Sequence, residues 1–95
     1  MSIRITCINK DGGNHENPYV AIKALGWVNE VTSENGTTIR EEMHDWIKKG
    51  EVAYVKDVYG DKAYLIAEVS QYGTKYVRTR PDGIKADNLL KLPKC

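Results

Sequence analysis

Three segments of strand-like sequence follow one another between residues 51 and 79, with only short connections between them. They read EVAYVKDVY, KAYLIAEVS and KYVRT. Each is rich in β-branched or aromatic residues, which favour strands. Gly60-Asp61 and Tyr72-Gly73-Thr74 supply turns, and connections this short join antiparallel neighbours. The sequence therefore predicts an antiparallel meander over this part of the chain.

The first part of the chain adds further strands. Residues 3–9 alternate apolar with polar side chains, which predicts a strand. Residues 19–29 fit either a strand or a helix, and the glycine within them favours the strand because a mid-helix glycine costs about 1 kcal/mol. Residues 10–18 and 32–37 are dense in turn formers, and the Asn-Gly pair in the second stretch is the strongest short turn signal in the chain.

One amphipathic helix is predicted at about residues 39–49. Its apolar residues recur at helical spacing. They are Ile39, Met43, Trp46 and Ile47. Thr38 is expected to be the N-cap, with Glu41 completing a capping box, and Gly50 stands where a C′ glycine belongs. His44 lies one position off the apolar stripe, so we interpret it as a flank residue.

Together these elements predict a single small α+β domain over residues 1–95. Its mainly antiparallel sheet of four or five strands is packed by the one helix. A chain of 95 residues suffices for one modest core. Near the end of the chain, Leu89, Leu90 and Leu92 follow a turn-rich stretch, and we expect these leucines to plug the open edge of the core.

Two features bear on the compartment. No apolar run in the sequence approaches the roughly 20 residues that span a bilayer, and no signal-peptide pattern follows Met1. We therefore expect a cytoplasmic protein without a membrane partner. Cys7 and Cys95 are expected to be free thiols, because neither their number nor their spacing suggests a disulfide framework.

Candidate catalytic groups are sparse. His15 and His44 are the only histidines, and neither has a nucleophile or metal partner that the sequence reveals. No C-x-x-C or H-x-x-x-H spacing supports zinc. The carboxylate pairs are explained by helix-terminus charge and turn chemistry. We therefore expect no catalytic residue, no metal, no cofactor, and a binding protein rather than an enzyme.

The charge distribution is uneven although the net charge is only +1. Residues 71–95 hold six Lys or Arg and two Asp, which nets +4, whereas residues 1–70 hold eight basic and eleven acidic residues, which nets −3. A basic terminal segment can face an anionic ligand. Alternatively, the two oppositely charged regions can pack together, within one chain or between subunits.

Tyr76, Arg78 and Arg80 share one face of the last predicted strand. Guanidinium groups fork onto phosphate or carboxylate oxygens, and a tyrosine offers a π-face to a base. These three residues are the candidate ligand-binding residues, with Asn88 as a polar orienter. They suit a small anionic, nucleotide-like ligand. The alternative is that the arginines pair with Glu68 or another acidic neighbour across the sheet.

Several short motifs resemble a known family. They are Ile-Thr-Cys near the start, Gly-Trp at 26–27, REEMHDWIKKG, AYV, KYVRT and DNLLKLP. They resemble a family of small bacterial and phage proteins that is catalogued as a domain of unknown function, over nearly the whole chain. The resemblance implies a free-standing compact α+β module and brings no established activity, cofactor or catalytic residue.

These observations lead to a functional expectation with alternatives. The leading one is a non-enzymatic binding module for a nucleotide-like anion, such as a phage-type sponge that sequesters a nucleotide immune signal, with a site that could form between subunits of a homo-oligomer. The alternative is a protein–protein interaction module whose face comprises Trp27 and the tyrosines. Extended nucleic-acid binding is disfavoured by the net charge of +1, and an enzyme is the least favoured class.

Overall fold

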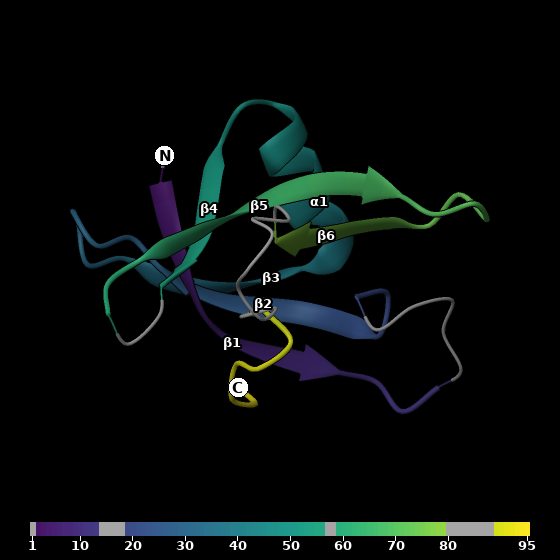
Figure 1. The fold of residues 1–95 in the computed structure, drawn as a ribbon, viewed down its shortest axis with the longest axis horizontal. Helices are drawn as coiled ribbons and strands as arrows, with labels where there is room; N and C mark the ends of the chain where they lie inside the picture. The colour runs from purple at the N-terminus through teal and green to yellow at the C-terminus, as the bar shows by residue number, and fades with distance from the viewer. Residues whose placement is uncertain (1, 14–18, 57–58, 80–88) are drawn as a thin grey trace.

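Six strands form one sheet in the computed structural model, which describes residues 2–13, 19–56, 59–79 and 89–95 (Figure 1). The strands are β1 (Ser2–Lys10), β2 (Ile22–Val28), β3 (Asn35–Ile39), β4 (Val52–Lys56), β5 (Lys62–Val69) and β6 (Lys75–Thr79). Their spatial order is β3-β2-β1-β4-β5-β6. Only the β1–β4 pair is parallel. The α+β class is confirmed, with one strand more than the sequence predicted.

β1 is one of the two central strands, and irregular pairing lets it bury apolar side chains along its length. Ile3, Ile5 and Ile8 are all buried. Strict alternation would turn Ile8 to the opposite face from Ile5. The β1–β2 register shifts between Ile5 and Cys7, and a bulge of this kind resets which side chains face inward. The three isoleucines can therefore join one core.

The sheet curves because β5 pairs with two different strands along its length, first with β4 and then with β6. Its first residues pair with β4, from Lys62 to Tyr64, and its later residues pair with β6, from Leu65 onward. The helix α1 (Arg40–Lys48) contacts β5 and β6 on one side and β2 and β3 on the other. In Figure 1, α1 lies behind β5 and β6. The sheet thus wraps around the helix, and its concave side holds the core.

The helix prediction is confirmed in place but corrected in two details. Ile39, not Thr38, is the N-cap, and no side chain caps this end, so the expected capping box is absent. His44 is buried with Met43 rather than placed on an exposed flank. Gly50 does end the helix with φ +106°, a conformation that favours glycine. No described helix is long and apolar enough to cross a membrane.

The turn expected at residues 32–37 lies earlier, and Asn35-Gly36 belongs to β3. The chain reverses over residues 29–34, where the Asn29 side-chain oxygen accepts hydrogen bonds from the backbone N–H groups of Val31 and Thr32. Gly36 is required for another reason. A Cβ at this position would lie 2.9 Å from the indole ring of Trp27, so a glycine is needed where that ring covers the strand.

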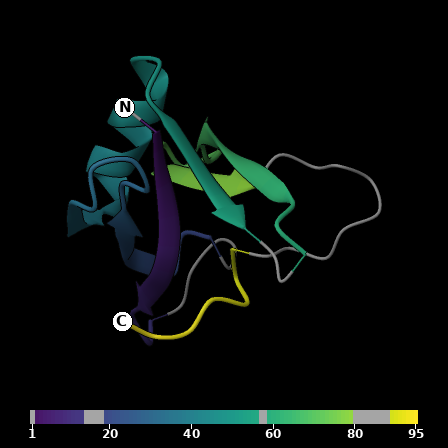
Figure 2. The same ribbon diagram turned by 90° about the vertical axis from the view of Figure 1, so that its left-hand side faces the viewer.

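The end of the chain closes the core as predicted. Leu89 is fully buried within the core, and Leu90 and Leu92 pack partly against it. The tail then pairs with β1, where Ile8 N–H donates to the Pro93 carbonyl and Cys95 N–H donates to the Ile8 carbonyl. β4 pairs with β1 only from Ser2 to Arg4. The tail therefore takes a place beside β1 beyond the end of its pairing with β4 (Figure 2).

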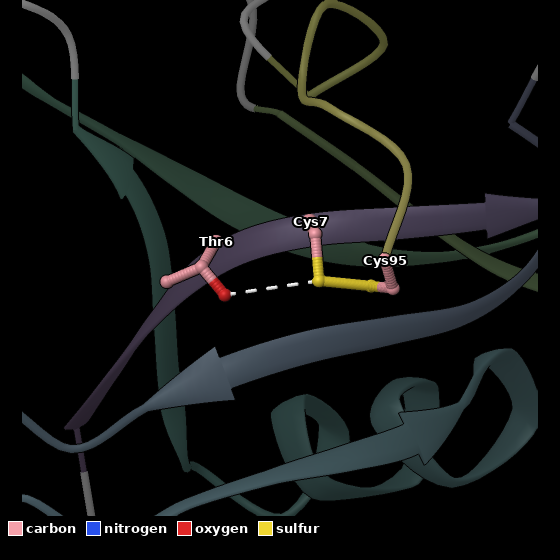
Figure 3. The surroundings of a disulfide bond; sticks show 3 residues. All are labelled: Thr6, Cys7 and Cys95. Atoms are coloured by element: carbon pink, nitrogen blue, oxygen red, sulfur yellow. Dashed lines mark hydrogen bonds between the residues drawn. A yellow bond between two sulfur atoms is a disulfide. The ribbon is translucent and has the colours of Figure 1, made fainter.

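The two cysteines form a disulfide, so the prediction of free thiols is wrong. Cys7 of β1 is bonded to Cys95 of the tail (Figure 3). The bond links residues 88 positions apart, and closing a loop of that length stabilises a fold by about 4–5 kcal/mol in the chain-entropy account. Cysteine spacing could not reveal this pair, because only the return of the tail to β1 brings the two thiols together.

The disulfide explains a glycine in the middle of β2. Gly26 pairs with Cys7 across the β1–β2 ladder. A Cβ on Gly26 would overlap Cys7 Sγ and lie 3.0 Å from Cys95 Sγ. A strand glycine often marks such a close approach. The same glycine that favoured a strand over a helix in the sequence therefore has a packing role.

We predict that Leu89→Ala lowers the free energy of unfolding by about 2–5 kcal/mol, because it leaves a cavity in a core that packs around this side chain. Urea denaturation followed by circular dichroism would measure the change. Leu92→Ala, at a partly buried position of the same tail, is the matched control and should cost less. Buried leucines lose about 2–5 kcal/mol on this substitution. If Leu89→Ala changes the free energy of unfolding by less than about half a kcal/mol, the tail does not seal the core.

We predict that Gly26→Ala destabilises the oxidised protein by about 1–3 kcal/mol, the usual cost of overpacking. The cost should shrink in a Cys7→Ala/Cys95→Ala background, because the sulfur atoms that oppose the new methyl group are gone. The four proteins form a double-mutant cycle that thermal denaturation can close. If Gly26→Ala lowers the free energy of unfolding equally with and without the disulfide, Gly26 is not needed to make room for the sulfur atoms.

Candidate functional site

Two of the four predicted site residues lie on the outer face of the sheet, away from the helix. Tyr76 and Arg78 are partly exposed on β6, whereas Val77 and Thr79 are buried between and beyond them. This alternation is the period-2 pattern of a strand with one buried face, so the shared face of Tyr76 and Arg78 is confirmed. Arg80 and Asn88, the other two predicted site residues, lie outside the described residues.

Tyr76 is held in a stacked pair that the sequence did not reveal. Its ring lies 6.3 Å from the ring of Tyr19, centroid to centroid, and the planes differ by 25°. Tyr19 precedes β2 and packs partly against the core. A ring fixed in this way loses little further freedom when a planar group lies against it. The pair is therefore a preorganised aromatic platform, which we call the Tyr19–Tyr76 platform.

The side chain of Arg40 holds the two halves of this platform together. Its Nη1 donates to the Val20 carbonyl at 2.7 Å, and its Nε donates to the Lys75 carbonyl at 2.8 Å. Val20 and Lys75 are the chain neighbours of Tyr19 and Tyr76. A guanidinium presents several donors in one rigid plane, so one side chain can fix the start of β2 against the start of β6.

The charged groups beside the platform are paired within the chain. Arg78 Nη2 donates to Glu68 Oε1 at 3.3 Å, which is the pairing considered as the alternative in the sequence. Lys75 Nζ lies 3.1 Å from Asp45 Oδ1. Hydrogen bonds from His44 and then from Lys75 lower the pKa of the Asp45 carboxyl below its usual range. Arg78 is only partly exposed, and among the described residues Glu68 is the only hydrogen-bond partner of its side chain.

A second polar cluster surrounds Glu30, which lies in the turn after β2 and has its partners on β1 and β4. The carboxylate accepts a hydrogen bond from the Tyr54 hydroxyl and lies 3.8 Å from Arg4 Nε and 3.6 Å from Lys56 Nζ. The Tyr54 hydrogen bond is the main cause that lowers the pKa of Glu30. Burial, together with the Glu30 hydrogen bond, raises the pKa of Tyr54 to about 12. The single carboxylate thus offsets one of the two positive charges that Arg4 and Lys56 bring.

A shallow hollow of about 280 Å³ lies between β1 and the tail, lined by Ile8, Lys10, Leu92 and Lys94. Its lysines could contact an anion. None of the described residues that line it is aromatic, so among them a base would find no stacking partner. The hollow is therefore a weaker candidate for a nucleotide-like ligand than the Tyr19–Tyr76 platform.

Other candidate residues have structural positions. Trp27, expected on an interaction face, donates its indole N–H to the Thr38 hydroxyl at 2.9 Å and packs edge-to-face on Trp46. Both rings pack against the core. In the ranges that the structure describes, no three His, Cys, Asp or Glu side chains gather as metal ligands would. His15 lies outside the described residues.

Sequence reasoning missed Tyr19 and Arg40, the residues that complete the platform. Tyr19 follows a stretch of turn formers, and Arg40 stands among charged residues at a helix start. Both are ordinary in such positions. Only the approach of β2 to β6 gives them a shared role, and no local pattern signals that approach.

The chain belongs to a family of proteins of unknown function, DUF3892, whose pattern matches residues 4–93. The resemblance expected from the sequence motifs is thereby confirmed at the level of an uncharacterised small domain. No curated protein and no solved structure matches the chain significantly.

We predict that Arg40→Lys loosens the Tyr19–Tyr76 platform and lowers the free energy of unfolding by about 1–3 kcal/mol. Two different nitrogens of Arg40 bind the Val20 and Lys75 carbonyls, whereas a lysine has only one side-chain nitrogen to place. Nuclear Overhauser contacts between the two tyrosine rings should weaken or disappear. Arg78→Lys, which changes a partly exposed ion pair, is the control and should cost less than about 1 kcal/mol. Unchanged ring contacts in Arg40→Lys would contradict the bridging role.

Proposed function

We propose that this domain is a non-enzymatic binding module for a small anionic, nucleotide-like ligand. The observation that carries the proposal is the Tyr19–Tyr76 platform beside Arg78 on one exposed face. A base or other planar ring would lie against Tyr76. The phosphate or carboxylate of the same ligand would lie against the guanidinium of Arg78.

The chemistry of Arg78 supports the anionic part of the ligand. A guanidinium has five N–H donors, and one of its nitrogens engages Glu68. The remaining donors can fork onto a phosphate, which two parallel hydrogen bonds hold with a defined orientation. Glu68 also fixes the guanidinium beside the platform, but its negative charge opposes an incoming anion. Glu68 therefore helps binding by holding Arg78 in place and weakens binding by repelling the anion.

The class of ligand that we propose includes nucleotide immune signals, which a phage-type sponge would sequester. A sequestering protein needs tight, stoichiometric binding and no reaction centre. Enzymes instead place acid, base or nucleophile groups around the ligand. A protein–protein interaction is the second candidate, and the observation that favours it is the edge strand β3.

We predict that a nucleotide raises the melting temperature of the protein, because a ligand that binds only the native state stabilises it by mass action. Thermal scans against cyclic and linear nucleotides would identify it, with the matching nucleosides as uncharged controls. Arg78→Gln should abolish the shift. Glu68→Gln should tighten binding by up to about fivefold, since an ion pair near the surface is worth up to about 1 kcal/mol. Lys48→Gln, on the helix, removes a positive charge elsewhere and should change nothing.

Two outcomes would contradict this proposal. One is the absence of any shift with the nucleotide panel at millimolar concentration. The other is a ligand that is chemically altered when it is recovered from heat-denatured protein, which would favour an enzyme. Calorimetry of the ligand with Tyr76→Ala would separate the stacking contribution, which is worth about 1–3 kcal/mol for a base on an aromatic ring.

A further inference from the structure

The two edges of the sheet differ in how they are protected. β6 is one edge and β3 the other. At the β6 edge, Arg40 bonds the Lys75 carbonyl, and both Lys75 and Arg78 carry charge. Bound carbonyls and charged side chains discourage the addition of another strand. The β6 edge is therefore protected.

β3 has neither form of protection. Its sequence, Asn-Gly-Thr-Thr-Ile, contains no charged residue and no proline. One side of the strand pairs with β2. Within the described parts of the chain, no backbone hydrogen bond reaches β3 from its other side. The backbone N–H and C=O groups of β3 that point away from β2 are thus open to a partner, and such an edge is a template for strand addition.

Exposed apolar side chains lie at both ends of this edge. Ile39, at the end of β3, is 47% exposed, and Val31, in the turn that precedes β3, is 91% exposed. Single exposed apolar side chains are common on protein surfaces, so their exposure alone does not mark an interface. Their placement at opposite ends of one strand matters, because a two-fold axis across the strand exchanges its ends.

We propose that a second copy of this chain binds here, with the two β3 strands antiparallel about a two-fold axis at Thr37. This register places Asn35 of each copy opposite Ile39 of the other. It brings the exposed Ile39 of one copy toward the Val31 turn of its partner, and the reverse. A two-fold interface uses the same patch on both copies, and this edge has apolar groups where that symmetry requires them. The two sheets would join into one continuous sheet.

The absence of charge on β3 also favours a second copy. Like charges directly opposite across a strand pair are destabilising, and self-pairing of a charged strand would create them. β3 creates none. A five-residue strand pair is a small interface, below the roughly 1,000 Å² expected of a stable complex. The dimer should therefore dissociate in the micromolar range, and its existence does not depend on the proposed ligand.

Sedimentation velocity from about 5 μM to about 1 mM spans this range of affinity and should show a monomer–dimer equilibrium. Thr37→Lys should weaken the dimer at least tenfold, because the two lysines would face each other at the axis. Thr37 is exposed, so the monomer should still fold, which circular dichroism would verify. Tyr72→Lys, at an exposed turn position, adds the same charge elsewhere and should leave the dimer unchanged.

A charge exchange tests the register. Asn35→Lys and Ile39→Glu should each weaken the dimer, and the double variant should restore it, because residue 35 of one copy lies opposite residue 39 of the other and each lysine then faces a glutamate. Backbone amide exchange in β3 should also slow as protein concentration rises. A protein that stays monomeric throughout, a dimer that Thr37→Lys leaves intact, or a double variant that fails to recover would overturn the proposal.

Discussion

The arrangement of the outer face depends on the hydrogen bonds that the guanidinium of Arg40 donates to two backbone carbonyls. The guanidinium binds carbonyls at the start of β2 and at the start of β6, two strands that β1, β4 and β5 separate in the sheet. Because Arg40 is also the first residue of α1, one side chain joins the helix to both arms of the curved sheet. The Tyr19–Tyr76 platform follows from this closure.

The charged side chains of the outer face form local ion pairs and do not make a continuous positively charged surface. Glu68 accompanies Arg78, and Glu30 lies between Arg4 and Lys56. Any anion that binds there competes with a carboxylate of the protein itself. Affinity would therefore depend on how well a ligand replaces that carboxylate, and the net charge of the terminal segment is a poor guide to it. Stacking on a fixed ring adds to binding without this competition.

The predictable parts of the fold are those that neighbouring residues decide. The meander, the helix body and the opposite faces of Val77 and Tyr76 all follow from side-chain periods of 2 or 3.6. Two predictions, the Thr38 N-cap and the turn at Asn35-Gly36, are wrong for the same reason. Trp27 takes the Thr38 hydroxyl as its hydrogen-bond acceptor, and its ring covers Gly36. Thr38 and Gly36, which resembled a helix cap and a hairpin turn, therefore contact a tryptophan of the neighbouring strand instead.

The sequence by itself determined the α+β class, the order of most elements, the face that carries Tyr76 and Arg78, and the role of Leu89 in sealing the core. These depend on patterns within a few residues or on strong burial of apolar groups. Only the tertiary structure decided that Cys7 meets Cys95, that Tyr19 stacks on Tyr76, and that Arg40 joins β2 to β6. Each of these joins residues far apart in the chain, and their approach depends on strand order and on the curvature of the sheet, which no local pattern encodes.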